Sequence, residues 1–147
     1  MTETPIKSVD LDVAHTAFER AATTHEQVHE RFFFARLLGL NFSYSGETCD
    51  VTFEAESFMF NPKGSLHGGV VCLVMDAAMG HLLNHLGQPA VTLEMKTQFI
   101  RAIRGGTVRA VSSVLQRGRR VCYMQCSLFD HEGRLAAFAT ATWKGSA

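Results

Sequence analysis

Several features that mark whole classes of protein are missing from this sequence. No uninterrupted apolar run approaches the roughly 20 residues that a transmembrane helix needs. The first five residues have neither the basic stretch nor the apolar stretch of a secretory signal. The four cysteines form no CxxC pair, and the chain has no internal repeat. We therefore expect no membrane contact, and free thiols in a reducing compartment, the cytoplasm.

Composition and charge narrow the class further. The chain has 147 residues, 46% of them hydrophobic and 19% charged, which is typical of one folded domain. The net charge is zero, yet residues 1–86 hold 5 Lys/Arg against 11 Asp/Glu, and residues 87–147 hold 9 against 3. This balance argues against a nucleic-acid partner. The basic second half suits a small phosphorylated ligand, unless the two halves simply neutralise each other within one domain.

The spacing of apolar residues predicts two helices and six strands. Spacings of three and four indicate a helix from about His15 to Leu38, which Gly39 ends. A second helix, from Ser65 to about Leu86, is apolar on every face, so we expect it to be buried all round. Alternation and short turns indicate strands at 40–44, 48–55, 91–99, 107–115, 121–129 and 135–143.

The order of these elements predicts the fold class. A buried helix that precedes an antiparallel meander packs most efficiently in the concave face of a twisted sheet. This is an α+β hotdog fold, an antiparallel sheet wrapped round a central helix, here with an extra N-terminal helix. The alternative is an ordinary α+β sandwich with the helix flat on one face. We divide the chain into a leader with a helix, residues 1–38, and a hotdog domain, residues 39–147.

The second helix contains one carboxylate in an apolar setting. Between Val70 and Leu86 there is no Lys, Arg or Glu, and the only acid is Asp76. An ionised carboxylate among apolar groups is costly unless it is paired or hydrogen-bonded. Asp76 lies about two turns into the helix, which is too far to cap its N-terminus. It is therefore either a catalytic group or a structural residue that accepts hydrogen bonds from a neighbouring loop.

The start of the same helix is suited to stabilising an oxyanion. The N–H groups of a first helical turn are free, and glycines at Gly68 and Gly69 let a ligand approach them, although tight packing explains such glycines equally well. Gly68 and Asp76 are about 12 Å apart along the helix axis and roughly 80° apart around it. One helix cannot easily bring both to one carbonyl group. We therefore expect an active site shared between two antiparallel helices of a symmetric dimer.

These motifs together resemble a known family. The combination is Asn61, the His67-Gly68-Gly69 helix start and Asp76, followed by Gly87, Val91-Thr92 and Gly118-Arg119. It resembles the hotdog-fold acyl-CoA thioesterases of the phenylacetic-acid-degradation (PaaI-like) type, over most of the chain from about residue 39 to residue 143.

The resemblance implies a role for each matching residue. Asp76 would be the catalytic carboxylate, acting as nucleophile or as general base on water. Gly68 would donate its backbone N–H to the thioester oxygen, and His67 would fix that helix end and polarise the carbonyl. Asn61 would orient the thioester or the water, and the hydroxyl of Thr92 would hold the attacking water.

The resemblance also implies partners. The substrate would be an acyl-CoA with an aryl-acetyl or medium-chain acyl group, and the protein would be a homodimer or a homotetramer built as a dimer of dimers, with no metal and no cofactor. The run Phe32–Phe34 is a candidate lining of the acyl pocket. The candidate contacts to the CoA phosphates are Arg101, Arg104, Arg117, Arg119 and Arg120. The alternatives are a non-catalytic acyl-CoA-binding module and a hotdog hydratase with His67 as its base.

Overall fold

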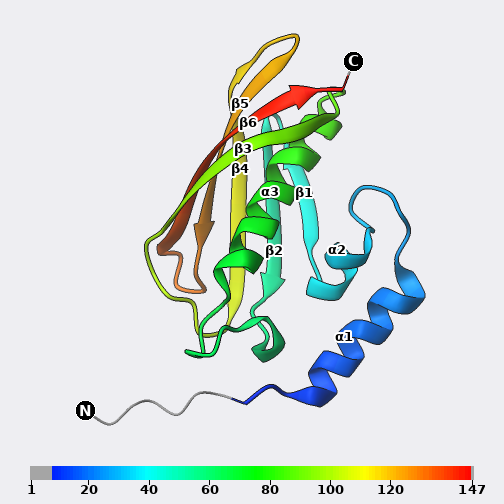
Figure 1. The fold of residues 1–147 in the computed structure, drawn as a ribbon, viewed down its shortest axis with the longest axis vertical. Helices are drawn as coiled ribbons and strands as arrows, with labels where there is room; N and C mark the ends of the chain where they lie inside the picture. Colours follow the sequence, from blue (N-terminus) through cyan, green and yellow to red (C-terminus); the bar gives the residue numbers. More distant parts are fainter. Residues whose placement is uncertain (1–7, 147) are drawn as a thin grey trace.

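The computed structural model describes residues 8–146. It contains a six-stranded sheet, one long helix and a helical N-terminal segment (Figure 1). In chain order the elements are α1 (Leu11–Thr24), α2 (Phe33–Leu38), β1 (Asn41–Ser45), β2 (Thr48–Glu54), the 3-10 turn η1 (Ser57–Met59), α3 (Gly68–His85), β3 (Ala90–Phe99), β4 (Thr107–Arg117), β5 (Val121–Phe129) and β6 (Leu135–Gly145). None of the helices in this part of the chain is long and apolar enough to cross a membrane.

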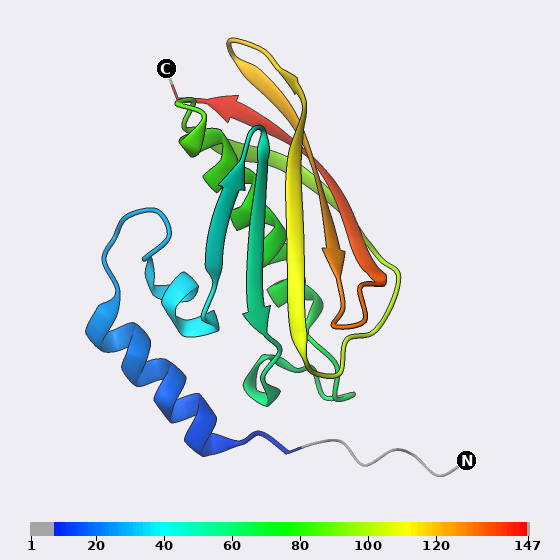
Figure 2. The same ribbon diagram turned by 180° about the vertical axis from the view of Figure 1, so that it is seen from behind.

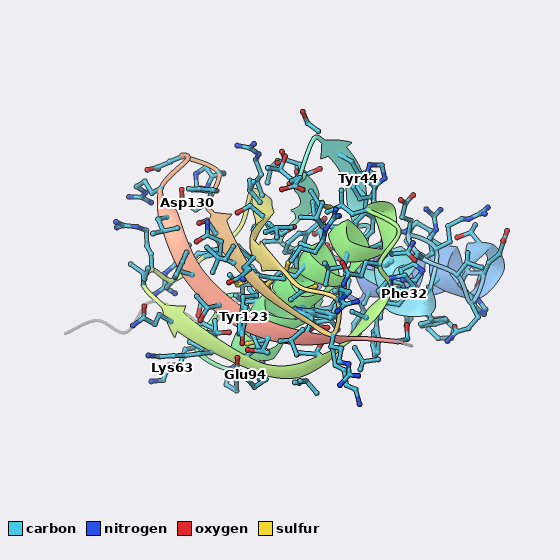
Figure 3. All side chains as sticks on the ribbon, turned by 90° about the horizontal axis from the view of Figure 1, so that it is seen from above. Phe32, Tyr44, Lys63, Glu94, Tyr123 and Asp130 are labelled. Atoms are coloured by element: carbon cyan, nitrogen blue, oxygen red, sulfur yellow. The ribbon has the colours of Figure 1, made fainter. Side chains whose placement is uncertain are left out.

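The sheet wraps round α3, as the sequence predicts for a hotdog fold. Its strands follow the order β1-β2-β4-β5-β6-β3, and every neighbouring pair is antiparallel. Viewed from the end of the molecule, β3, β6, β5 and β4 curve around one flank of α3 (Figure 3). The flat sandwich alternative is therefore wrong. All six predicted strands are present, with ends displaced by at most two residues.

Apolar side chains on three sides of α3 form the core. Val74, Met75, Met79, Leu82 and Leu83 are fully buried against the inward-facing residues of the strands. Each such side chain contributes about 1.5–3 kcal/mol through its removal from water. This burial fixes the axial position and the rotation of α3 in the sheet.

The prediction that α3 is buried all round is wrong on one stripe. Along this stripe Gly69 is exposed, and Cys72, Leu73, Asp76 and Gly80 are only half-buried. The stripe lies on the flank of α3 beyond β3, and β3 is the last strand of the sheet. Residues 8–146 do not cover this stripe completely. One flank of the apolar helix α3 is therefore left partly open.

The predicted helix from His15 to Leu38 is in fact two helices. α1 ends at Thr24, and residues 25–32 form a turn in which Glu30 has a positive φ of 71°. The backbone N–H of Glu30 donates to Nε2 of His81 on α3 at 2.8 Å, and the Glu30 carboxylate accepts from Tyr44 Oη at 2.5 Å. These bonds require the chain to leave the helical path. Gly39 ends α2 in the left-handed conformation, as predicted.

The N-terminal segment therefore lies on the side of the molecule that carries β1. Figures 1 and 2 show α1 and α2 beside β1, at the opposite edge of the sheet from β3. The proposed boundary between leader and domain at residue 38 stays a prediction, and its first seven residues lie outside the described part of the chain.

Candidate active site

Asp76 is held by a single hydrogen bond from the neighbouring strand. The hydroxyl of Thr92 donates to Asp76 Oδ1 at 2.7 Å. Thr92 lies where the pairing of β3 with β6 shifts by one residue, so that Leu93 is extra. Such bulges re-aim side chains, and this one directs Thr92 toward α3. No backbone N–H among residues 8–146 donates to Asp76, which removes the loop-capping alternative for that part of the chain.

Two features of its surroundings act on the pKa of Asp76 in opposite directions. Burial against the apolar helix raises the pKa of the Asp76 carboxyl above its usual value, and the Thr92 hydrogen bond offsets part of that rise. Cys72 lies one turn earlier on the same stripe, and its Sγ is 3.5 Å from Thr97 Oγ1 on β3. A half-buried carboxylate with a raised pKa is the kind of group that accepts a proton during catalysis.

The N-terminus of α3 presents hydrogen-bond donors. His67 is the N-cap residue, and its Nδ1 accepts from the Gly69 N–H at 2.8 Å. In the neutral ring the proton therefore lies on Nε2, which is free to donate. Within residues 8–146, no acceptor is bonded to the Gly68 N–H. The predicted oxyanion donor is thus available.

Tight packing also explains Gly68. A Cβ added at this position would lie 3.2 Å from Cζ of Phe99, which is closer than ordinary contact. The glycine thus lets the Phe99 ring lie against the first turn of α3. The two interpretations of the double glycine are both consistent with the geometry at this residue.

The side chain of Asn61 is used to shape the loop before α3. Its Oδ1 accepts from the Lys63 N–H at 2.9 Å and the Ser65 N–H at 3.3 Å, and its Nδ2 donates to Ser65 Oγ at 3.1 Å. These bonds are typical of an Asx turn. Asn61 therefore positions the segment that leads to His67. One hydrogen of its amide remains free for a substrate.

An apolar cavity of about 310 Å³ adjoins Gly68. It lies between the first turn of α3 and the ends of β3, β5 and β6. Its lining includes Asn61, Gly68, Val71, Phe99, Leu128 and Ala137. Its size and apolar walls suit the acyl part of a thioester.

The run Phe32–Phe34, predicted as an acyl-pocket lining, is absent from this cavity. Phe32 packs against the His81 ring and Phe33 against Phe18, while Phe34 is exposed.

The five arginines predicted to contact phosphates lie in two separate places. Arg101 lines the cavity beside Gly68, and Arg104 Nη1 donates to the carbonyl of Lys63 at 3.4 Å, so both are near the start of α3. Arg117, Arg119 and Arg120 lie at the other end, in the β4–β5 hairpin. α3 has 18 residues and spans about 27 Å between these ends. One chain cannot direct all five arginines to the same group of phosphates.

The groups of the predicted site do not meet within one chain. The cavity beside Gly68 includes neither Asp76 nor Thr92. The two parts are eight residues apart on one straight helix. Asn61, His67 and Gly68 form one part, and Asp76 with Thr92 forms the other.

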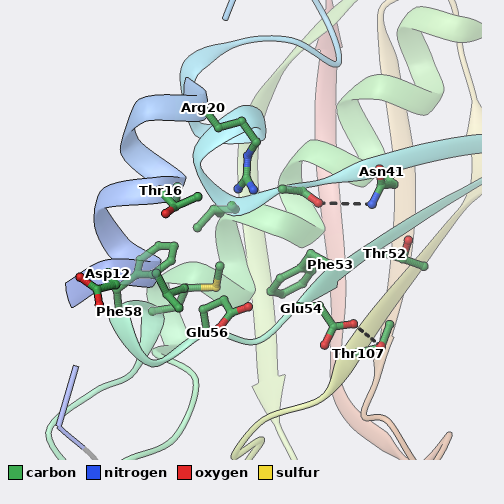
Figure 4. A pocket seen from close by; sticks show the side chains of 15 residues that line it. Asp12, Thr16, Arg20, Asn41, Thr52, Phe53, Glu54, Glu56, Phe58 and Thr107 are labelled. Carbon is green, nitrogen blue, oxygen red and sulfur yellow. Dashed lines mark hydrogen bonds between the residues drawn. The ribbon is translucent and has the colours of Figure 1, made fainter. Parts of the chain in front are cut away.

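Another cavity, of about 470 Å³, lies between α1 and β2 (Figure 4). Its walls include Asp12, Glu54 and Glu56 beside Phe53 and Phe58, and none of the predicted catalytic residues. The Arg20 side chain at its edge is bonded to the carbonyls of Arg36 and Leu37 at the end of α2. This cavity is therefore separate from the candidate catalytic residues.

His81 is a buried residue that is fully engaged. Its Nδ1 is 2.8 Å from the Ala77 carbonyl, and its Nε2 accepts from Glu30. Burial lowers the pKa of His81 to about 4, which keeps the ring neutral near pH 7. The signal that Glu30 meets His81 is a tertiary contact that no local pattern contains.

Comparisons with known proteins agree with this fold. A family model described as the thioesterase superfamily matches residues 63–137, from the loop before α3 into β6. The 1,4-dihydroxy-2-naphthoyl-CoA hydrolase of Escherichia coli (strain K12) is 31% identical over 109 residues, which cover 71% of this chain and 80% of that protein.

Two solved structures share the fold. The PaaI protein of E. coli, from the phenylacetic acid degradation operon, matches with a TM-score of 0.77 and 21% identity, covering 92% of this chain and 96% of its own. A Bacillus halodurans protein solved with CoA matches with a TM-score of 0.83 and 21% identity, covering 96% and 95%. These two structures agree with the fold, and the family model together with the 31% identical relative shows that the chain belongs to the thioesterase superfamily.

Proposed function

We propose that the protein is an acyl-CoA thioesterase that hydrolyses an acyl-CoA to the free acid and CoA, with Asp76 as the catalytic carboxylate. The observation that carries this proposal is the 2.7 Å hydrogen bond from Thr92 to Asp76, at a half-buried position on an otherwise apolar helix. A module that only binds an anionic ligand gains nothing from a carboxylate there, because like charges repel.

The residues supply each part of the reaction. Asp76 takes a proton from a water molecule as the water oxygen bonds to the carbonyl carbon, or its own oxygen forms that bond. The free N–H of Gly68 donates to the oxyanion, and Nε2–H of His67 is a second donor. The C–S bond then breaks, and CoA leaves as a thiol after it takes up a proton. Where Asp76 itself attacks, water then hydrolyses the acyl–Asp76 anhydride, which releases the acid and restores the carboxylate. This chemistry uses no metal and no cofactor.

The active site is completed by a second copy of the chain. The open stripe of α3 that carries Asp76 continues onto β3, an edge strand on which Val91 is 57% and Leu93 is 55% exposed. Apolar side chains and unpaired strand edges of this kind are usually covered by a partner. A two-fold axis beside α3 makes the helices antiparallel and brings Gly68 of one protomer toward Asp76 of the other. A tetramer is a pair of such dimers.

The CoA phosphates bind at the β4–β5 hairpin. Arg119 and Arg120 line a cavity of about 440 Å³ with Lys144 and Ser146, beyond the C-terminus of α3. Three cations and a hydroxyl around one hollow suit a nucleotide with several phosphate groups. Arg101 and Arg104 are at the acyl end of the same protomer and have a smaller part in phosphate binding.

The acyl group is aryl-acetyl, aroyl or medium-chain. The cavity beside Gly68 has a volume of about 310 Å³ and is lined mostly by apolar residues, which favours a compact apolar group over a very long chain. The similarity to the 1,4-dihydroxy-2-naphthoyl-CoA hydrolase supports an aromatic acyl group. The four cysteines are free thiols, in keeping with a cytoplasmic protein.

The proposal is tested by measuring thiol release from a panel of acyl-CoAs. The panel contains phenylacetyl-CoA, hydroxyphenylacetyl-CoA, benzoyl-CoA and octanoyl-CoA, and Asp76→Asn serves as the matched control. We expect turnover of at least one substrate by the wild-type protein and almost none by the variant. Binding without thiol release would support the non-catalytic module. Loss of the enoyl absorbance of crotonyl-CoA without thiol release would support the hydratase.

The two possible roles of Asp76 are distinguished by oxygen labelling. In a single turnover in ¹⁸O-water with enzyme in excess, attack by a water that Asp76 deprotonates puts ¹⁸O into the product acid and none into Asp76. Direct attack forms an acyl–Asp76 anhydride, and water that opens it at the Asp76 carboxyl carbon leaves ¹⁸O in Asp76 and ¹⁶O in the product, so label in Asp76 identifies direct attack.

A further inference from the structure

We propose that Gly80 and Trp143 are positioning residues for the reaction, because their contact sets the separation between α3 and the strand that carries Thr92. The inference rests on the proposed function, since it concerns the carboxylate that performs the chemistry. Neither residue touches the reacting atoms. Their effect passes through the hydrogen bond between Thr92 and Asp76.

The contact between Gly80 and Trp143 leaves no room for a side chain. A Cβ added at Gly80 would lie 2.9 Å from Cη2 and 3.1 Å from Cζ3 of the indole ring. A glycine in a helix interior costs about 1 kcal/mol relative to alanine. Gly80 lies well inside α3 and has a helical backbone, so no turn requires it. The close approach of the ring is the physical reason for a glycine here.

Trp143 lies directly beside Thr92. The two residues are register partners in the β3–β6 pairing, at the bulge that directs Thr92 toward Asp76. Trp143 is only 4% exposed, and its indole N–H has no hydrogen-bond partner within residues 8–146. Within the described chain, the position of the indole ring is therefore fixed by packing rather than by a hydrogen bond. Any shift of the ring moves the strand position opposite Thr92.

α3 is also held from the other side. The hydroxyl of Ser112 on β4 donates to the carbonyl of Ala78 at 2.8 Å. The helix is thus fixed between β4 and the indole on β6 at the turn that follows Asp76. Gly80 is one turn after Asp76 on the same stripe. A methyl group at position 80 must move either the helix or the indole, and we expect the displacement to lengthen the 2.7 Å bond between Thr92 and Asp76.

The hydrogen bond between Thr92 and Asp76 can be followed through the pKa of the Asp76 carboxyl. Within residues 8–146, burial raises the pKa of Asp76 and the Thr92 hydrogen bond lowers it. Glu94, the nearest acid on β3, accepts from Thr142 instead. Loss of the Thr92 bond therefore raises the pKa of Asp76, because the hydroxyl stabilises the ionised carboxylate.

The experiment compares Gly80→Ala, Trp143→Phe and the double variant. Phenylalanine lacks the outer indole atoms that the new methyl group meets, and it leaves no hydrogen bond unmade. We expect Gly80→Ala to lower kcat by about tenfold with KM changed less than about twofold, and to move the acidic limb of the rate profile to higher pH. The double variant should recover to within about threefold of Trp143→Phe alone.

Thr23→Ala is the matched control. Thr23 is exposed on α1, its hydroxyl donates to the Glu19 carbonyl of its own helix, and alanine likewise improves helix propensity. We expect wild-type kcat and an unchanged acidic limb from this variant. If Gly80→Ala does not fold, Trp143→Phe carries the test, with an expected loss of about threefold in kcat and the same upward movement of the limb.

A measurement without turnover separates this inference from the proposed function. The ¹³C resonance of the Asp76 carboxyl can be titrated in the wild-type protein and in Gly80→Ala. A higher pKa in the variant supports the positioning role even if no acyl-CoA is hydrolysed, an outcome that would reject only the function. An equal pKa, a wild-type rate profile for Gly80→Ala, or a double variant no better than Gly80→Ala would overturn the inference.

Discussion

His67 has two tasks that different substitutions can separate. Its Nδ1 caps α3 through the Gly69 N–H at 2.8 Å, and its Nε2–H is left to donate to a substrate carbonyl. His67→Ala removes both functions. His67→Asn keeps an oxygen that can cap the helix, since asparagine is among the best N-cap residues, but it has no donor in the position of Nε2.

The two effects have different sizes. Loss of an N-cap costs about 0.5–2 kcal/mol, and because His67 is exposed we expect the lower half of that range. For a domain of this length that corresponds to a fall in Tm of about 1 to 5 °C. Loss of one oxyanion donor costs about 100-fold or more in kcat. We therefore expect His67→Ala to lose both stability and activity, and His67→Asn to lose activity alone.

Differential scanning calorimetry and a thiol-release assay check these expectations. Both variants should keep the far-UV circular dichroism of the wild type. If His67→Asn had full activity, the ring would serve only as a cap, and the donor role of Nε2 would be wrong. If His67→Ala had an unchanged Tm, the capping bond would contribute nothing and the assigned tautomer would lose its basis.

Further predictions concern the carboxylate, the edge strand and the buried histidine. Asp76→Asn should lower turnover by at least about 100-fold with the fold intact, as measured by thiol release and circular dichroism. Thr92→Val should raise the pKa of Asp76 and move the acidic limb of kcat/KM to higher pH, whereas Thr92→Ser should leave it in place. Leu93→Lys should convert the dimer to inactive monomers in sedimentation experiments, because a charge cannot be buried at that edge. Because the pKa of His81 is lowered to about 4, its protonation favours the unfolded chain, so the free energy of unfolding should fall as pH drops from about 6.5 to 4.

Each of these predictions has an outcome that contradicts it. Near-normal turnover by Asp76→Asn would remove that residue from the mechanism, and a rate profile unmoved by Thr92→Val would deny the hydrogen bond any role. A fully active Leu93→Lys monomer would disprove the shared site. His81→Gln should flatten the pH dependence of urea unfolding, and an unaltered slope would show that other groups cause it.

The sequence predicted the parts of the fold that depend on local periodicity. Period-two alternation located all six strands, and the uniformly apolar segment located α3, because burial acts on every residue of these elements. The break between α1 and α2 was not predictable in the same way. Phe32 and His29 keep a helical spacing, but their rings pack on His81 rather than on helix neighbours. Glu30 adopts a positive φ without the glycine that usually signals it.

The separation of the five arginines into two groups could have been predicted from the sequence. Successive antiparallel strands reverse direction, so the turn that contains Arg104 and the hairpin that contains Arg119 fall at opposite ends of the sheet. The contact of Gly80 with Trp143 could not have been predicted from the sequence. These residues are far apart in the chain, and their meeting depends on the rotation of α3, which the summed burial of the whole core determines.

The two edges of the sheet are unequal, and this limits how large an assembly can grow. Among residues 8–146, β3 offers ten residues of edge, whereas β1 offers five and is tied to the preceding turn by the hydrogen bond from Tyr44 to Glu30. If the β3 edges of two protomers pair about a two-fold axis, neither β3 edge is left free to bind another chain. What remains at both outer margins is a short strand that is a poor template for another chain. A chain that pairs in this way would thereby be protected from assembling further into a fibre.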